Sequence, residues 1–305
     1  MVPPLKRLRR LLRYLALRGL LIPLRVLPLA FVSRLGAQLG LWAFTLIPSQ
    51  RNKALASLQV AYPAMPEIER SALARASFEH LGRTVAEMVC IEHFDARRHE
   101  LVEWPAEARA VMDNALSKGK GVVFVTGHLG NWELLARHVA LEGYPAVVIG
   151  KEMSDERTTA LLEDFRRSGK VEVIWRGRPG SAKAMLRALK SNSILGLLID
   201  QDTKVQSLWV PFFGRLAKTP RAAADLALRT GAAPLVGFCI RTGHLRYRIS
   251  MEAIPLPEGD GEVAVEALTA TLTSAIENRI RAHPDQWVWV HQRWKSPPPQ
   301  GKLVA

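Results

Sequence analysis

From Gly121 onward, short unbroken apolar runs alternate with amphipathic stretches of helical length, and this alternation constrains the fold more than any other feature of the sequence. Unbroken apolar runs are typical of strands buried on both faces, as in parallel sheets covered by helices. The pattern predicts strands over 122–125, 146–149, 171–175, 194–199, 234–240 and 245–251, and helices over 134–142, 158–168, 181–189, 220–230 and 263–281. We therefore expect an α/β fold with a mostly parallel central sheet flanked by helices.

The first fifty residues have a different character. The chain carries 42 Lys and Arg against 28 Asp and Glu. The first acidic residue is Glu67, and ten of the basic residues precede it. A basic arm can bind nucleic acid, but here the basic residues alternate with large apolar ones, a pattern that favours an anionic membrane surface. We therefore expect a lipid membrane as a partner and no nucleic acid.

This contrast predicts two parts: an N-terminal membrane anchor or set of interfacial helices over 1–50, and an α/β domain over 51–305. The second part begins with helices, expected over 67–91 and 106–116. The uncharged stretch from Leu35 to Gln50 has 16 residues, whereas a spanning helix needs about 20. Whether residues 15–47 span the membrane or lie in its interface stays open, and so does a third possibility, a buried amphipathic hairpin.

The segment Thr126 to Glu133, with the sequence TGHLGNWE, carries the first candidate site. It joins a predicted strand to a predicted helix, and functional groups of open α/β sheets gather at such carboxyl ends of strands. We expect Glu133, one turn into the helix, to fold back and orient the ring of His128. The free ring nitrogen would then take a proton from a hydroxyl as general base. Backbone N–H groups at the helix start are candidates for stabilising an oxyanion.

Taken alone, a histidine and a glutamate five residues apart are more often structural than catalytic. The motif contains no serine or cysteine nucleophile, so a serine triad is not indicated. The two cysteines, Cys90 and Cys239, are far apart in the sequence and predict neither a disulfide framework nor a zinc site. No metal is expected.

Two further segments follow predicted strands or close the chain. Asp200-Gln201-Asp202 comes directly after the strand over 194–199, where carboxylates can orient hydroxyls, bind a cation or simply cap a loop. Residues 284–295, PDQWVWVHQRWK, are rich in tryptophan, which more often packs than binds a ligand.

Together these segments resemble the lipid A biosynthesis lauroyl/myristoyl acyltransferase family, a branch of the lysophospholipid acyltransferase superfamily. The likeness covers most of the chain in order. It includes the N-terminal apolar segment, the H-x4-E pair His128 and Glu133, the Asp200 segment, residues 210–214 (VPFFG), Thr219-Pro220, and the closing segment 284–294. Each motif is moderately specific, but their order and spacing make a coincidental match implausible.

The resemblance implies an enzyme on the cytoplasmic face of the bacterial inner membrane. It would move an acyl group from acyl carrier protein or acyl-CoA to a hydroxyl of a lipid A precursor, in lipopolysaccharide biosynthesis, with no cofactor. His128 is then the general base and Glu133 its partner. Expected substrate contacts come from a larger set: Asp200, Gln201, Asp202, Lys151, Arg176, Gly214 and Thr219. We also expect a monomer.

The sequence departs from the family where Gly150-Lys151-Glu152-Met153 replaces an expected Arg-Pro after the second strand. The acceptor therefore stays open, and another glycolipid, an aminolipid or a lysophospholipid is an alternative. Lys151 and Arg176 follow strands and are candidates for phosphate or carrier contacts, although charged residues in such positions are more often solvated surface charges. Two other hypotheses remain: a lipid hydrolase that uses water, and a non-catalytic basic protein that binds anionic polymers.

Overall fold

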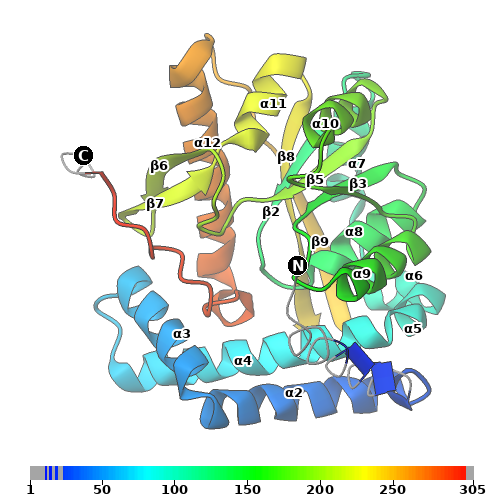
Figure 1. The fold of residues 1–305 in the computed structure, drawn as a ribbon, viewed down its shortest axis with the longest axis vertical. Coiled ribbons are helices and arrows are strands. Elements are labelled where there is room, and N and C mark those ends of the chain that lie inside the picture. The colour runs from blue at the N-terminus through cyan, green and yellow to red at the C-terminus, as the bar shows by residue number, and fades with distance from the viewer. Residues whose placement is uncertain (1–10, 12–13, 16–17, 20–22, 300–305) are drawn as a thin grey trace.

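The computed structural model describes residues 11, 14–15, 18–19 and 23–299. Its main feature is a seven-stranded sheet in the order β1-β9-β8-β2-β5-β3-β4 (Figure 1). All neighbouring strands run parallel except β8 and β9, which are antiparallel. The strands are β1 (Val102–Glu103), β2 (Val122–Thr126), β3 (Ala146–Gly150), β4 (Glu172–Trp175), β5 (Ile194–Leu198), β8 (Ala233–Gly243) and β9 (Arg246–Ala253).

Helices cover both faces of this sheet. One face packs against α7 (Ala106–Leu116), α8 (Trp132–Leu141) and α9 (Glu156–Ser168), and the other against α10 (Ser181–Lys190), α11 (Ala222–Thr230) and α12 (Gly261–Ala282). Every residue of β2 is buried, and its side chains enter the two cores in turn: Val122 and Phe124 join one, Val123 and Val125 the other. Burial on both faces is why the strand is apolar without alternation, and the predicted α/β class is confirmed.

A second, two-stranded sheet was not predicted from the sequence. The strands β6 (Ser207–Phe212) and β7 (Arg215–Pro220) form an antiparallel hairpin beside α12. The two residues between them, Phe213 and Gly214, both have positive φ, 54° and 70°. This backbone suits a tight hairpin turn, but phenylalanine is not a residue that signals such a turn. The two-residue strand β1 was also not predicted.

Three helices lie together at the lower end of the molecule in Figure 1. They are α2 (Leu29–Leu46), α3 (Pro48–Ala61) and α4 (Glu67–Val89), and the short α5 (Ile91–Ala96) and α6 (Arg98–Leu101) follow. Helices α2 and α4 pack through glycines. A Cβ atom on Gly82 would lie 2.2 Å from the carbonyl oxygen of Gly36, and one on Gly40 would lie 2.1 Å from that of Phe78. The two backbones are therefore in direct contact.

A buried carboxylate ties this helix pair to the sheet. Glu87 of α4 is fully buried and accepts a hydrogen bond of 2.6 Å from Ser33 of α2. It also forms an ion pair with Arg241 of β8, with N···O distances of 2.8 and 2.9 Å, and accepts a hydrogen bond from Tyr247 of β9. Helix α2 is therefore attached to the α/β domain by packing and by a polar network, whatever its relation to the membrane.

The glycine contact gives a test of this packing. Replacing glycine by alanine in a helix interior normally adds about 1 kcal/mol of stability. At Gly82 we expect the opposite, because the new methyl group would overlap the backbone of Gly36. Gly82→Ala should lower the free energy of unfolding by about 1–3 kcal/mol, measured by chemical denaturation in detergent. Gly243→Ala is the control, since a Cβ there meets only an ordinary contact at 3.8 Å. A Gly82→Ala protein as stable as the parent would contradict the close approach.

Candidate active site

The parallel neighbours β2 and β5 bring the side chains of His128 and Asp200 together. In the register of β2 and β5, Thr126 lies opposite Leu198. His128 and Asp200 each follow two residues later, so they leave the sheet side by side at the same edge. The Nδ1 atom of His128 lies 2.8 Å from Oδ1 of Asp200. Strand pairing alone therefore assembles a carboxylate–imidazole pair from residues 72 positions apart.

Asp200 is fully surrounded by donors. Its Oδ2 accepts the backbone N–H of His128 at 2.6 Å and the indole N–H of Trp287 at 2.8 Å. Burial alone would raise the pKa of the Asp200 carboxyl. The attraction and hydrogen bond from His128, the nearby His291 and the Trp287 donor outweigh it and hold that pKa well below its usual range. Asp200 is therefore ionised, which places the proton of a neutral His128 on Nδ1 and leaves Nε2 as an acceptor.

The glycines of the loop after β2 permit this geometry. A Cβ atom on Gly127 would come within 3.0 Å of Oδ2 of Asp200. Gly130 has a φ of +65°, and a Cβ there would lie 2.1 Å from the carbonyl oxygen of Cys239. Either side chain would push the loop away from its neighbours, so both positions need glycine.

A buried histidine of α4 also holds this loop. The Nε2 atom of His80 lies 3.2 Å from the carbonyl oxygen of Gly130. Burial, with nearby Arg241, lowers the pKa of His80 to about 3. The ring is therefore neutral at physiological pH, and Nε2–H donates to that carbonyl. Nothing in the sequence pattern signalled this role for His80.

Glu133 has a different partner from the one expected. Its carboxylate pairs with Arg166 of α9, at 2.6 Å from Nη2 and 3.0 Å from Nε. The expected contact with His128 is not formed, because Asp200 occupies Nδ1 of the ring and Glu133 points from α8 toward α9. The third guanidinium nitrogen of Arg166, Nη1, is buried without a hydrogen-bond partner in the described part of the chain.

A cavity of about 320 Å³ opens beside His128. It is lined by His128, Trp132, Gln201, Lys151, Arg166 and Arg176, together with apolar side chains such as Leu162 and Met185. The cavity thus combines a candidate base, three cationic side chains and an apolar wall. Such a mixture suits an amphiphilic ligand that carries an anionic group.

The remaining residues proposed from sequence lie elsewhere. Asp202 is buried, and its carboxylate accepts the backbone N–H of Ser296. Thr219 is buried and bonded to Arg293. Gly214 is at the exposed tip of the β6–β7 hairpin. None of these three lines the cavity beside His128, so their expected substrate contacts stay predictions.

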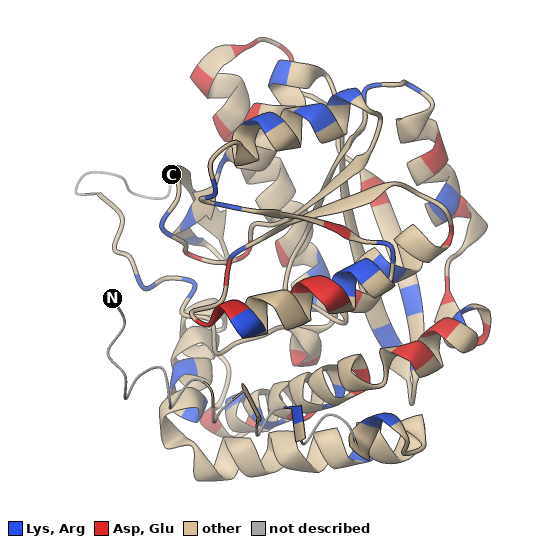
Figure 2. Ribbon diagram, turned by 45° about the vertical axis from the view of Figure 1, so that its right-hand side comes forward, with Lys and Arg blue, Asp and Glu red and all other residues tan. Residues whose placement is uncertain are grey.

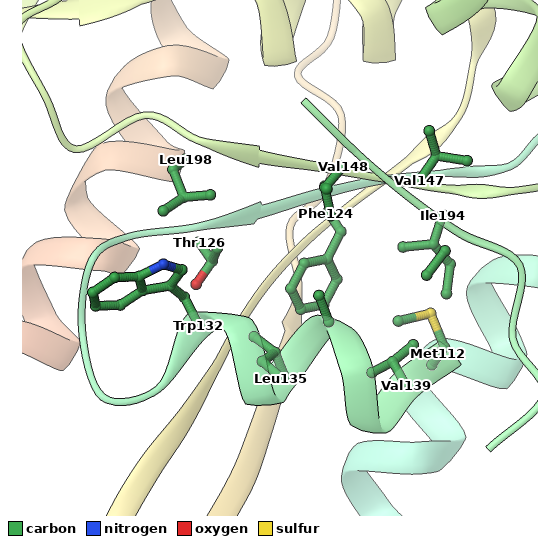
Figure 3. Close-up of a pocket in the computed structure, with 13 residues that line it drawn as sticks. Met112, Phe124, Thr126, Trp132, Leu135, Val139, Val147, Val148, Ile194 and Leu198 are labelled. Carbon is green, nitrogen blue, oxygen red and sulfur yellow. The ribbon is translucent and has the colours of Figure 1, made fainter. Parts of the chain in front are cut away.

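A second, narrow cavity adjoins the first. It lies between α8 and the sheet and is lined almost entirely by apolar side chains, which Figure 3 shows from Trp132, Thr126 and Leu198 at one end to Met112, Val139 and Ile194 at the other. Trp132 and Leu198 line both cavities. In the part of the chain that the structure describes, no group of three or more His, Cys, Asp or Glu side chains could hold a metal ion.

The family model for bacterial lipid A biosynthesis acyltransferases matches residues 3–296. A phosphatidylinositol mannoside acyltransferase of Mycobacterium tuberculosis is 26% identical over 185 residues, which are 60% of this chain and only 57% of that enzyme. The lipid A biosynthesis lauroyltransferase of Escherichia coli is 23% identical over 279 residues, 89% of this chain and 88% of that enzyme. The palmitoleoyltransferase of the same organism is 24% identical, over 89% and 87%. The chain belongs to the bacterial lipid A biosynthesis acyltransferase family.

Proposed function

We propose that this protein is a membrane-bound O-acyltransferase that moves a fatty acyl group from a thioester, acyl carrier protein or acyl-CoA, to a hydroxyl of a lipid. The observation that carries the proposal is the His128–Asp200 pair at the entrance of a cavity with cationic and apolar walls. Family membership supports it.

The chemistry follows from the positions of the protons. The acceptor hydroxyl gives its proton to Nε2 of His128 while its oxygen attacks the thioester carbonyl carbon. The carbonyl electrons move onto oxygen, return, and expel the thiolate, which takes the proton from the imidazolium. Asp200 stays ionised throughout and stabilises the imidazolium. Only a proton and an acyl group change places, so we propose that no cofactor takes part.

Glu133 acts in this proposal through Arg166. The carboxylate binds two guanidinium nitrogens and so fixes the Arg166 side chain at the cavity. Lys151 and Arg176 line the same cavity, and we propose that these three cations attract a phosphate there. Both the phosphopantetheine arm of the donor and a phosphorylated lipid acceptor carry one.

The narrow apolar cavity has a volume of about 50 Å³, which is room for roughly four water-sized groups. We propose that the acyl chain enters here and that the apolar walls move apart to hold its full length. The lining of the cavity is apolar except for Thr126, and the cavity meets the His128 cavity at Trp132 and Leu198. An acyl chain that entered there would have its carbonyl near His128 and its methyl end near Met112 (Figure 3). The length of the cavity would then select the length of the chain.

A lipid A precursor is the acceptor that we propose, because relatives named for lipid A biosynthesis match along 89% of this chain. A mannosylated phosphoinositide or another glycolipid is the alternative, since a relative is named for that substrate. Acyl transfer would then take place at the cytoplasmic face of the bacterial inner membrane.

Membrane attachment is proposed to occur through the outer face of α2. This helix is long and apolar enough to cross a membrane, and a third of it is buried in the protein. Its outward side chains include large apolar ones: Phe31, Leu39, Trp42 and Leu46 are 47–75% exposed. In Figure 2 the ribbon of α2, at the bottom, is almost free of charged residues. A surface helix of a water-soluble protein would expose polar residues here.

An interfacial position suits α2 better than a spanning one. The contacts between Ser33 and Glu87, Gly36 and Gly82, and Gly40 and Phe78 run along the two helices in antiparallel order. If α2 crossed the bilayer, α4 would have to follow it with the charges of Arg75, Glu79 and Arg83, at high cost. Lying flat, α2 inserts its apolar face and leaves α4 in water. Arg25 and Arg34 are exposed nearby and would meet anionic head groups.

The first prediction concerns the base and its partner. His128→Ala and Asp200→Asn should each lower the rate of acyl transfer in membranes by about 10²–10⁴-fold. His128→Ala removes the base. Asp200→Asn removes the negative charge that orients the His128 ring and stabilises the imidazolium. The measurement is acyl transfer from a labelled thioester to the lipid fraction. His99→Ala and Asp164→Asn, both exposed, are the matched controls. Undiminished transfer in His128→Ala would refute the proposal, and release of free fatty acid without acylated lipid would indicate a hydrolase.

A second prediction concerns chain length. Met112→Trp should fill the far end of the apolar cavity, and activity should shift toward shorter acyl chains. One methylene of misfit in an apolar pocket is worth roughly 10–200-fold, so the longest accepted chain should lose at least about tenfold. The assay compares thioesters of increasing length. Met153→Trp, at a half-exposed position, is the control. An unchanged length profile in Met112→Trp would place the acyl chain elsewhere.

A third prediction concerns the membrane face. The double variant Trp42→Glu, Leu46→Glu should bind anionic vesicles at least about tenfold more weakly, because burying a large apolar side chain contributes about 1.5–3 kcal/mol. Vesicle flotation of the full-length chain measures the effect. The control is the double variant Gln206→Glu, Thr271→Glu, which adds the same charge at exposed positions away from α2 and should bind as the parent does. Equal binding of the double variant and the parent would show that other residues attach the protein.

A further inference from the structure

The oxyanion formed during acyl transfer needs hydrogen-bond donors, and the loop after β2 has already used most of the backbone donors near His128. The N–H of His128 donates to Asp200 at 2.6 Å, that of Gly130 to the carbonyl of Gln286 at 3.1 Å, and that of Asn131 to the carbonyl of Cys239 at 2.9 Å. The N–H of Leu134 donates to the side chain of Asn131 at 3.0 Å. These groups hold the loop and are not free for a substrate.

The side-chain amide of Gln201 is a donor that remains beside His128. The Nε2 atom of Gln201 lies 3.1 Å from Nε2 and 3.2 Å from Nδ1 of His128. A point almost equally far from both nitrogens lies over the face of the ring, because the ring carbon between them blocks an approach in the ring plane. The in-plane lone pair of His128 Nε2 thus remains open to an acceptor hydroxyl. The Gln201 amide sits above it and lines the same cavity.

His291 fixes the direction of this amide. Its Nε2 lies 2.6 Å from Nε2 of Gln201, and its ring centroid lies 4.8 Å from that of His128. Burial and the neighbouring His128 lower the pKa of His291 to about 4, against the opposite effect of Asp200. The ring is therefore neutral near pH 7, so its Nε2 accepts one N–H of Gln201. The second N–H of that amide has no contact other than the face of the His128 ring, and Gln201 lines the cavity.

We propose that Gln201 is the oxyanion donor of the acyl-transfer reaction and that His291 is the positioning residue that aims it. This inference rests on the proposed function. When the acceptor oxygen bonds to the thioester carbon, the π electrons of the carbonyl move onto its oxygen, and the free N–H of Gln201 donates to that charge. When the electrons return, the carbon–sulfur bond breaks, and the thiolate leaves with the proton held by His128. Gln201 forms no covalent bond and changes no protonation state.

The proposal separates Gln201 and His291 from residues that only bind substrate. A donor that acts on the oxyanion affects kcat, whereas a donor to the ground-state substrate affects KM as well. Loss of one oxyanion donor lowers kcat by about 10²–10³-fold. Gln201→Leu, which cannot donate, and Gln201→Glu, which is ionised near pH 7, should both show this loss with KM for the thioester within about threefold of the parent.

The variants of His291 test the positioning role. His291→Phe cannot accept the amide N–H, and its kcat should fall to about the level of Gln201→Leu. His291→Gln places a carbonyl oxygen where the ring nitrogen was and should recover at least about tenfold of that loss. A merely structural role for His291 would not be rescued in this way. Thermal unfolding of each variant is recorded beside the kinetics, so that a folding defect is recognised.

The experiment uses the full-length chain in anionic vesicles, with the acyl thioester that the parent turns over. Gln206→Leu, an exposed glutamine, is the control and should keep the parent kcat. If the parent transfers no acyl group, the proposed function fails and this inference with it. If the parent is active and His128→Ala is not, but Gln201→Leu keeps its kcat, only the role of Gln201 is overturned. Full activity of His291→Phe, or no rescue in a folded His291→Gln, would overturn the role of His291.

Discussion

The three hydrogen bonds accepted by the Asp200 carboxylate are the interaction on which the site depends. They join the end of β5 to the ring and the backbone of His128 and to Trp287 near the C-terminal end of the chain. Because the carboxylate is buried, losing any of these donors would leave charge poorly compensated. Gly127 gives it room. The same few atoms therefore fix the loop, the tautomer of the base and the closing segment.

Helix α4 connects this centre to α2, the helix that we propose as the membrane contact. Its His80 donates a hydrogen bond to the carbonyl of Gly130. About two turns further along, its Glu87 accepts a hydrogen bond from Ser33 and pairs with Arg241. The backbone of Arg241 is hydrogen-bonded to the side-chain amide of Gln286. The backbone carbonyl of Gln286 accepts the N–H of Gly130. Helix α2, the proposed membrane contact, and the loop that carries His128 thus belong to one packed unit.

The sequence predicted the α/β class and most strands, because apolar runs report burial along the chain. It could not predict the partner of His128. Glu133 is near in sequence, but Asp200 is near in space, because β2 and β5 are neighbours in the sheet while two strands separate them in the chain. Adjacency of strands depends on packing between distant segments, and a single sequence does not report it. The β6–β7 turn was missed for a local reason, a phenylalanine with positive φ.

In the structure Asp200, and not Glu133, accepts the Nδ1–H of His128. Proton NMR of the detergent-solubilised protein tests it directly, since an imidazole N–H bonded to a buried carboxylate resonates far downfield. The resonance should be present in the parent and in Glu133→Gln, and absent from His128→Ala and Asp200→Asn. A resonance that disappears in Glu133→Gln and persists in Asp200→Asn would contradict the account.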